Sequence, residues 1–361
     1  MPPTTPRFHR LRVRDVVRET AKAVSIAFDV PPELADEFTF APGQYLTLRT
    51  TIDGEEQRRS YSICSGAHED ELRVAVKEVQ QGVFSTWVNR SLHAGDTIDV
   101  MTPTGRFGLG AACTDGGTYA AFVAGSGITP VLSLVRSVLH REPGSRFFVF
   151  YGNRVAADIL FNEELSDLKD RYLGRLSVVH ILSREEQDLP ILNGRLDGEK
   201  VRALLSHMLP AATIDHAFVC GPAGMIDEVS ATLAELGLPA DRIHVERFVS
   251  TEGGTPRRAR VVVAPDAPAA HTAVLILDGN RREVPVAEGE AIVDAAIRAG
   301  LDLPFACKGG MCATCRARIV EGAAVMDVNY SLELWEVKSG FVLTCQAHPT
   351  TPRIVVDYDH V

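Results

Sequence analysis

Four cysteines in the last sixty residues have the types and spacing of an iron–sulfur ligand set. Cys307, Cys312 and Cys315 lie in one loop, separated by four residues and then by two, and Cys345 follows after a long gap. This is the plant-type spacing for a [2Fe–2S] cluster, whose irons need four converging thiolates. Gly309 and Gly310 would let backbone N–H groups approach the sulfides. The loop predicts a low-potential centre that passes on single electrons.

Other uses of these cysteines fit the spacing less well. A structural zinc site usually combines two short Cys or His clusters, and this chain has one Cys-x-x-Cys pair. No histidine takes the place of a cluster cysteine, so a Rieske centre is not supported. The remaining three of the seven cysteines are scattered and are expected to be free thiols; they are Cys64, Cys113 and Cys220.

A second group of residues suits a flavin. One expected strand carries Arg59, Tyr61 and Ser62. The Arg59 guanidinium can bind a phosphate in a fixed geometry, the Tyr61 ring can stack on an aromatic cofactor, and the Ser62 hydroxyl can bond to a ring nitrogen of that cofactor. An expected helix starts nearby, and N–H groups at such a start favour a diphosphate. Taken alone, an ordinary strand and a plain N-cap explain these residues too. The further residues of this group are Lys77, Gly82, Val83, Phe84 and Ser85.

A third group suits a nicotinamide nucleotide. The glycine-rich loop at 125–130 stands between an expected strand and helix, where glycines let a pyrophosphate approach the backbone. The loop does not have the G-x-G-x-x-G pattern, so the ordinary dinucleotide fingerprint is not met. Pro130 suits the first turn of the helix. The candidate residues here are Gly125, Ser126, Gly127, Thr129 and Pro130.

Further candidates follow later strands of the same expected sheet. Arg154 follows one strand and Arg184 another, and arginines at such ends could hold the 2′-phosphate of NADPH. A pair of solvated surface arginines is the alternative, and a buried core thiol is the alternative role for Cys220. The other strand-end candidates are Ser183, Gly221, Pro222, Glu246 and Phe248.

The elements that would position these groups form three regions. Residues 8–110 contain short strands separated by turns, which predicts a small antiparallel barrel with one helix at 83–92. From 118 to 246, strands alternate with helices, which predicts a doubly wound parallel sheet with ligands at its carboxyl edge. Residues 250–270 are rich in Gly, Pro and small side chains, as linkers are. The remainder predicts a compact β-rich domain with one helix across its sheet.

Composition narrows the function classes. The formal net charge of −10 argues against a nucleic-acid partner and against an anionic membrane surface. No signal core and no run of about 18 apolar residues occurs, which predicts a cytoplasmic protein without a membrane partner. No Ser/His/Asp triad or metal-spaced histidine cluster is evident, as expected where bound cofactors do the chemistry.

These motifs, in this order along the whole chain, resemble those of the ferredoxin–NADP reductase-like reductases of multicomponent oxygenases. The resemblance is carried by residues 55–64, 125–130, 151–154, 193–200, 220–222, 306–315, 329–333 and 343–347. It implies an FAD-binding antiparallel β-barrel at 1–112 and an NAD(P)-binding α/β domain with a doubly wound parallel sheet at 113–249. A linker at 250–270 and an α+β, β-grasp [2Fe–2S] ferredoxin domain at 271–361 would follow.

The resemblance also implies roles for the candidate residues. Arg59 would hold the flavin and its phosphates, Tyr61 would stack on the isoalloxazine, and Ser62 would bond near its N5. Residues 82–85 would hold the diphosphate, which favours FAD over FMN. Residues 125–130 would cradle the nicotinamide nucleotide, with Thr129 near the flavin. The catalytic group would be Ser62, Cys220 and Glu246, with Phe248 beside the flavin and nicotinamide.

The implied activity is electron transfer from NADPH through FAD and the cluster to an oxygenase. Arg154, Ser183 and Arg184 would select NADPH, although related reductases that use NADH can carry an arginine after the same strand. The partner would be a diiron oxygenase, with Lys308 and Met311 on the docking face. Two alternatives remain open: a reductase for a ketosteroid hydroxylase or a Rieske ring-hydroxylating dioxygenase, and a structural or regulatory docking subunit without turnover.

Overall fold

The computed structural model describes residues 6–110, 115–248, 263–264 and 267–360. The chain divides into two compact units, of which the larger comprises residues 9–57 and 61–248 and the smaller contains the carboxyl-terminal residues. Cys113 and most of the expected linker at 250–270 lie outside the described residues. The expected barrel, apart from residues up to 8 and residues 58–60, therefore belongs to one unit with the nucleotide-binding sheet, and the β-rich domain belongs to the other.

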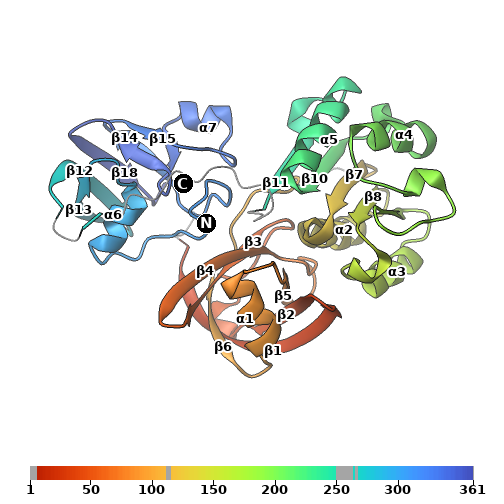
Figure 1. The fold of residues 1–361 in the computed structure, drawn as a ribbon, viewed down its shortest axis with the longest axis horizontal. Coiled ribbons are helices and arrows are strands. Elements are labelled where there is room, and N and C mark those ends of the chain that lie inside the picture. The colour runs from red at the N-terminus through yellow and green to blue at the C-terminus, as the bar shows by residue number, and fades with distance from the viewer. Residues whose placement is uncertain (1–5, 111–114, 249–262, 265–266, 361) are drawn as a thin grey trace. The chain divides into compact units, whose positions relative to one another are not determined.

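The larger unit begins with a six-stranded antiparallel sheet that curves into a half-barrel around α1 (Figure 1). Leu11 and Val13 of the first strand are buried between exposed arginines, and this alternation turns one face of the strand toward the core. The strand order β4-β3-β6-β1-β2-β5 confirms the predicted antiparallel architecture. The elements are β1 (Phe8–Thr20), β2 (Ala23–Asp29), η1 (Pro32–Leu34), β3 (Tyr45–Ile52), β4 (Glu55–Ser62), β5 (Leu72–Lys77), α1 (Val83–Ser91) and β6 (Thr97–Met101).

The second part of the larger unit is a five-stranded parallel sheet of order β11-β10-β7-β8-β9, as the alternation of elements predicts. Its strands are β7 (Thr118–Ala124), β8 (Arg146–Asn153), β9 (Leu176–Leu182), β10 (His216–Gly221) and β11 (Ile243–Arg247). Its helices are α2 (Ile128–Arg141), α3 (Asn162–Arg171), α4 (Gly198–Met208) and α5 (Ala223–Glu235). Short 3₁₀ turns are η2 (Gly125–Gly127), η3 (Ala156–Asp158), η4 (Pro190–Leu192), η5 (Ala211–Thr213) and η6 (Ala240–Arg242).

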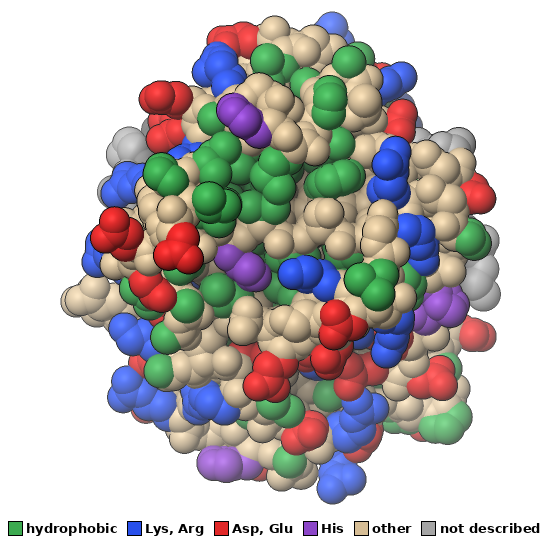
Figure 2. All heavy atoms as spheres, turned by 90° about the vertical axis from the view of Figure 1, so that its right-hand side faces the viewer, with side chains coloured by type: hydrophobic (Ala, Val, Ile, Leu, Met, Phe, Trp, Pro, Cys, Tyr) green, Lys and Arg blue, Asp and Glu red, His purple; other side chains and the backbone are tan. Residues whose placement is uncertain are grey.

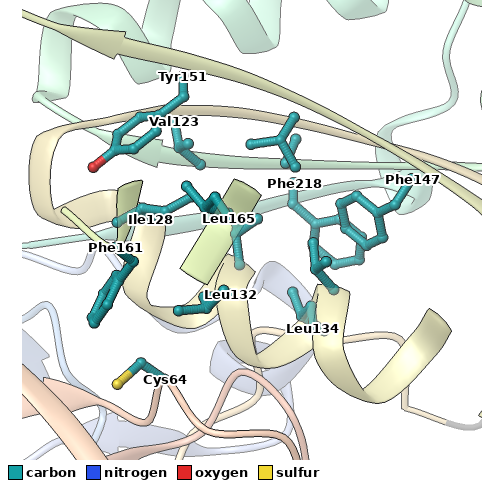
Figure 3. Packing of buried hydrophobic residues seen from close by; sticks show 14 of the residues in the cluster. Cys64, Val123, Ile128, Leu132, Leu134, Phe147, Tyr151, Phe161, Leu165 and Phe218 are labelled. Atoms are coloured by element: carbon teal, nitrogen blue, oxygen red, sulfur yellow. The ribbon is translucent and has the colours of Figure 1, made fainter. Parts of the chain in front are cut away.

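Both faces of this parallel sheet are covered, so β7 is apolar on both sides. Tyr119 and Val123 pack in one core with α2 and α3, and Phe122 packs in another with α4 and α5. The first core also takes side chains from the barrel. Figure 3 shows Cys64, which follows β4, below Phe161 and Leu132 of the sheet domain. One continuous apolar core therefore joins the barrel to the sheet.

The smaller unit is built on a mixed five-stranded sheet of order β13-β12-β18-β14-β16, with helix α6 packed on it. Asp278 and Gly279 have positive φ at the predicted hairpin turn between its first two strands. Its strands are β12 (Ala269–Leu277), β13 (Asn280–Ala287), β14 (Arg316–Glu321), β15 (Ala324–Met326), β16 (Phe341–Leu343), β17 (Ala347–Pro349) and β18 (Arg353–Asp357). Its helices are α6 (Ile292–Arg298) and α7 (Leu334–Lys338). The predicted β-rich domain with a helix across its sheet is confirmed.

Surface charge is mixed in the view of Figure 2, which faces the right-hand side of Figure 1. Acidic and basic side chains lie close together on this face, and the basic ones are scattered over it.

In the described part of the chain, every helix is too short or too polar to span a membrane.

Candidate redox sites

The predicted cluster cysteines of the smaller unit lie in two pairs. The side chains of Cys307 and Cys312 are hydrogen-bonded to each other, and so are those of Cys315 and Cys345. All four are free thiols. Within the described ranges, no three His, Cys, Asp or Glu side chains are grouped as ligands of a single metal ion. Two thiolates for each of two irons is what a [2Fe–2S] cluster requires, and the paired cysteines fit this requirement.

Hydrogen-bond donors surround the cysteine sulfurs. The Gly309 N–H lies 3.3 Å from Cys307 Sγ, the Thr314 hydroxyl 3.1 Å from Cys312 Sγ, and the Gln346 amide 3.6 Å from Cys345 Sγ. The Cys312 side chain, together with backbone N–H groups, lowers the pKa of Cys307 to about 6. The pKa values of Cys312 and Cys315 are raised instead, by the side chains of Cys307 and Cys345 and by burial. Hydrogen-bond donors stabilise negative charge on sulfur, so one cysteine of each pair is set to be a thiolate more readily than its partner.

The loop obtains its curvature at three residues with positive φ. Lys308, Gly310 and Ala313 have φ of 47°, 74° and 53°. Of the two glycines in the loop, Gly310 has positive φ and Gly309 does not, and Lys308 and Ala313 provide the other reversals. The Lys308 ammonium is anchored by an ion pair with Asp294 at 2.8 Å. The strained backbone of Lys308 is therefore held from outside the loop.

In the larger unit, the three predicted catalytic residues come together. Cys220 on β10 pairs in register with Glu246 on β11, at the carboxyl edge of the parallel sheet. Ser62, the last residue of β4, donates its hydroxyl hydrogen bond to Glu246 Oε2 at 3.1 Å. The barrel thus contributes one residue to the edge of the sheet where ligands of such folds bind.

The environment changes the acidity of both groups on the sheet. Burial raises the pKa of Glu246 to about 8, and the hydrogen bond from Ser62 opposes this shift only in part. Burial also raises the pKa of Cys220, and the Glu246 carboxylate raises it further. At neutral pH, Glu246 therefore holds its proton and Cys220 remains a thiol. Such shifted carboxyl groups in a cleft are candidates for a functional role.

The glycine-rich loop is packed closely against β10, the strand that carries Cys220. A Cβ placed on Gly127 would lie 2.2 Å from the Cys220 carbonyl oxygen, so only glycine fits. Gly125 has φ of 56°, and the Lys77 ammonium lies 3.9 Å from where its Cβ would be. Thr129 is 2% exposed, and its hydroxyl donates to the Ser126 carbonyl at 3.0 Å. These contacts fix the backbone of the loop at the start of α2, where helix N–H groups favour a phosphate.

Tyr151 is a contributor that the sequence did not single out for this role. Its buried hydroxyl donates to the Gly125 carbonyl at 2.9 Å and accepts a hydrogen bond from the Leu160 N–H at 3.2 Å. It therefore fixes the left-handed residue of the loop from the neighbouring strand β8. Nothing in the local pattern could have shown this, because Tyr151 and Gly125 are 26 positions apart.

The helix start expected to hold a diphosphate is formed as predicted. Gly82 precedes α1, and a Cβ there would meet Ser85 Oγ at 2.5 Å and Val79 Cγ2 at 2.3 Å. The Ser85 hydroxyl turns back to the Gly82 carbonyl, and α1 has no side-chain cap from the described residues. Thr86 and Arg90 of α1 line a cavity of about 600 Å³ next to this helix start. The cavity is lined by Lys22, Glu78, Val79, Gln80, Gln81, Thr86 and Arg90.

The two flavin candidates Arg59 and Tyr61 on β4 have different surroundings: the Tyr61 side chain packs on α1, and the Arg59 side chain is exposed. Tyr61 packs on the start of α1, with its ring centroid 5.9 Å from that of Phe84. Arg59 is exposed, and its guanidinium donates to the Arg58 carbonyl at 2.7 Å.

Phe248 is half-buried against the core that the barrel and sheet share. Gly221 and Pro222 follow β10 and lead into α5.

The two arginines expected at the sheet edge are adjacent. The Arg184 N–H donates to the Arg154 carbonyl at 2.8 Å, and the Ser183 hydroxyl donates to the Asn153 carbonyl at 3.3 Å. Both arginines are exposed at the ends of β8 and β9. The pairing of these strand ends places both arginines at the carboxyl edge of the parallel sheet.

Known protein families match all three regions. Residues 11–108 match the oxidoreductase FAD-binding domain, residues 122–231 the oxidoreductase NAD-binding domain, and residues 275–350 the 2Fe-2S iron-sulfur cluster binding domain. These matches agree with the flavin, nucleotide and cysteine motifs. The chain is thus an NAD(P)H-dependent oxidoreductase with FAD and a [2Fe–2S] cluster.

Whole-chain relatives carry the same order of parts. A subunit of the 1,2-phenylacetyl-CoA epoxidase from Escherichia coli K12 is 44% identical, over 98% of each chain. The ferredoxin reductase component of 3-ketosteroid-9-alpha-monooxygenase from Rhodococcus rhodochrous is 34% identical, over 96% of each. The solved structure of phthalate dioxygenase reductase has a TM-score of 0.60 at 22% identity, over 97% of this chain and 98% of that one, and shows the shared fold. The chain belongs to the ferredoxin–NADP reductase-like family that serves as reductase components of multicomponent oxygenases.

Proposed function

We propose that this reductase supplies electrons to a diiron oxygenase that epoxidises phenylacetyl-CoA. The observation that carries the proposal is the 44% identity, over 98% of both chains, with the subunit of the Escherichia coli phenylacetyl-CoA epoxidase. The paired cysteines and the joined flavin and nucleotide sites support turnover rather than a purely structural role. A reductase for a 3-ketosteroid monooxygenase is the second candidate, since that component is 34% identical.

Reconstitution of electron transfer with candidate oxygenases would test the identity of the partner. The purified holoenzyme would be mixed with the oxygenase component of phenylacetyl-CoA epoxidase, NADPH, oxygen and phenylacetyl-CoA, and the epoxide measured by mass spectrometry. A parallel reaction would contain a 3-ketosteroid 9α-hydroxylating oxygenase and its steroid. Product in the first reaction and none in the second supports the proposal. The reverse result would assign the protein to the steroid system.

The site residues define what the protein contributes to this transfer. When bound at these residues, FAD would supply hydride acceptance from a nicotinamide nucleotide and release of single electrons. We propose that Ser62 and Tyr61 orient the flavin ring, that Arg59, Lys77 and the start of α1 hold its phosphates, and that residues 125–130 hold the nucleotide. Phe248 would exclude water from the meeting point of the two rings.

Glu246 should give the flavin reduction step its pH dependence. Its raised pKa of about 8 means that the carboxyl group is neutral below that pH and becomes a carboxylate above it. Negative charge beside the flavin disfavours the transfer of a hydride, so the rate should fall as pH rises through about 8. Stopped-flow flavin reduction between about pH 6 and 9.5 would show this inflection.

Glu246→Gln removes the ionisable group but can still accept the Ser62 hydrogen bond, so its profile should be flat through this range. The exposed carboxylate of Glu288 offers a control, because Glu288→Gln should retain the inflection of the parent protein. An inflection near pH 8 that persists in Glu246→Gln would exclude Glu246 as its origin.

For the nucleotide, we propose that Arg154 and Arg184 bind the 2′-phosphate of NADPH. Arg184→Ala should raise the KM for NADPH about tenfold, because one charge-assisted hydrogen bond is lost, and leave the KM for NADH unchanged. Steady-state assays with ferricyanide as acceptor would measure both. Equal effects on the two nucleotides, or a parent enzyme that prefers NADH, would contradict this assignment.

A further inference from the structure

Four charged residues join the barrel to the sheet domain within the larger unit, and we call them the clamp: Glu69, Arg73, Arg136 and Glu164. Arg73 donates two hydrogen bonds of 2.7 Å to the two carboxylate oxygens of Glu164. Arg136 donates to Glu69 at 2.7 Å through one nitrogen and to Glu164 through the other. The side chains of both arginines are at most 13% exposed, and those of both glutamates at most 28%.

The clamp carries its charges in pairs despite its burial, although the Nε groups of Arg73 and Arg136 have no hydrogen-bond partner in the described residues. Burial acts to raise the pKa of Glu164, but hydrogen bonds from Arg73 and the charges of both arginines outweigh it, and the pKa is lowered. Glu71 lies 3.1 Å from Arg73 Nε and adds a further acidic contact. Buried ion pairs are weak sources of net stability, and removal of one partner is costly because it leaves an uncompensated charge. The clamp is therefore better explained by a role in fixing one relative geometry of the barrel and the sheet domain than by a gain in stability.

Each clamp element also carries part of the redox site. Arg73 lies on β5, which ends at Lys77 beside Gly125. Arg136 lies on α2, which begins directly after the glycine-rich turn. Glu164 lies in the first turn of α3, after the strand that carries Tyr151. The clamp therefore connects the barrel strand and the sheet-domain helices that lead to the two cofactor sites.

Neighbouring contacts make this connection rigid. The Ala67 N–H donates to the Ser137 hydroxyl of α2 at 2.9 Å, and the Arg73 guanidinium stacks 5.6 Å from the centroid of the Phe161 ring. Phe161 and Cys64 lie together in the shared apolar core (Figure 3). The ion pairs thus lie beside a packed interface and add directional bonds to it.

We propose that the clamp sets the distance and angle at which the barrel presents its flavin to the nicotinamide held by the sheet. The clamp residues are positioning residues, because they act through β5 and α2. Hydride transfer needs reacting atoms about 3–3.5 Å apart, whereas each cofactor can bind to its own domain without that alignment. The clamp should therefore affect the rate of flavin reduction more than the binding of either cofactor. This inference rests on the reductase activity, and not on the identity of the oxygenase.

Glu164→Gln tests the proposal in the holoenzyme. The amide cannot neutralise two arginines, so the alignment should loosen and the rate constant for flavin reduction should fall about ten- to a hundredfold. FAD content and the dissociation constants for NADH and NADPH should stay within about twofold of the parent. Glu163→Gln is the matched control, because Glu163 is the exposed neighbour in the same helical turn.

Anaerobic stopped-flow absorbance with NADH and with NADPH would measure binding and reduction separately. The charge-transfer absorbance between reduced flavin and oxidised nucleotide reports ring alignment directly and should weaken in Glu164→Gln but not in Glu163→Gln. Should Glu164→Gln fail to fold, Arg136→Lys keeps the charge but cannot bridge Glu69 and Glu164 as the guanidinium does. It should retain FAD and show the same selective loss of rate.

Three outcomes would overturn the proposal. One is an unchanged reduction rate in FAD-loaded Glu164→Gln or Arg136→Lys. Another is a rate loss fully explained by lost FAD or weakened nucleotide binding, which would mean a structural role only. The third is an equal loss in Glu163→Gln, which would indicate a general charge effect. If the parent protein itself failed to reduce its flavin with either nucleotide, the reductase assignment would fail instead.

Discussion

Replacing Cys345 with serine is expected to abolish electron delivery to an oxygenase while leaving NAD(P)H-dependent reduction of a dye intact. Cys345 is the one predicted cluster ligand outside the loop at 307–315, and it pairs with Cys315 to serve one of the two irons. A serine hydroxyl is a much harder and less acidic ligand than a thiol, so a stable cluster should not form. The nucleotide site and most of the flavin site lie in the other unit, and both keep all of their residues.

Absorption spectra, iron content, and parallel assays with ferricyanide and with an oxygenase would measure this separation. Cys64→Ser is a matched control in the larger unit, since a serine there can keep the hydrogen bond of 3.3 Å to the Arg73 carbonyl. It should retain both activities. Loss of the dye reaction together with the oxygenase reaction in Cys345→Ser would contradict the proposed division of labour between the two units.

Among the substitutions considered, Gly127→Ala should have the largest effect on the reduction of the flavin by the nicotinamide nucleotide. The added Cβ would meet the Cys220 carbonyl oxygen at 2.2 Å and its carbon at 2.6 Å, both backbone atoms that cannot rotate away. The glycine-rich turn must therefore move off β10, away from the Cys220 and Glu246 edge. We expect flavin reduction to slow about a hundredfold with FAD content largely kept, as measured by stopped-flow absorbance.

Gly224→Ala provides the comparison. Gly224 lies in the first turn of α5, and a Cβ there would have no atom within 4 Å. Alanine in a helix costs less conformational entropy than glycine, so this variant should be as stable as the parent or slightly more stable, and fully active. A fast Gly127→Ala enzyme would show that the turn can shift without loss of nucleotide alignment.

Residues that act within one short segment could be predicted from the sequence. The cluster loop and the start of α1 are of this kind, because ligand spacing and helix-end chemistry are local properties. The order of elements likewise predicted the two sheets, since short strands separated by turns favour an antiparallel barrel and strands alternating with helices favour a parallel sheet. Even so, the start of α3 at Asn162 depends on backbone conformation, because Phe161 takes a left-handed conformation with φ of 58° just before it.

Contacts between distant segments could not be predicted from local patterns. Ser62 and Glu246 are 184 positions apart, and their hydrogen bond exists only because the barrel packs on the sheet. Arg73 and Glu164 appear in the sequence as ordinary charges on a strand and a helix, yet they form a buried bidentate pair. The resemblance to oxygenase reductases supplied roles for the first pair, and only the three-dimensional packing revealed the second.

The position of β18 has a consequence for how the smaller unit is made in the cell. This strand lies between β12 and β14, parallel to β12, although it is nearly the last segment of the printed sequence. The central hydrogen-bond ladder cannot close until the ribosome has synthesised residue 357. Pairing between segments this far apart makes folding slow, so the cysteine loop is expected to receive its metal only after translation of β18.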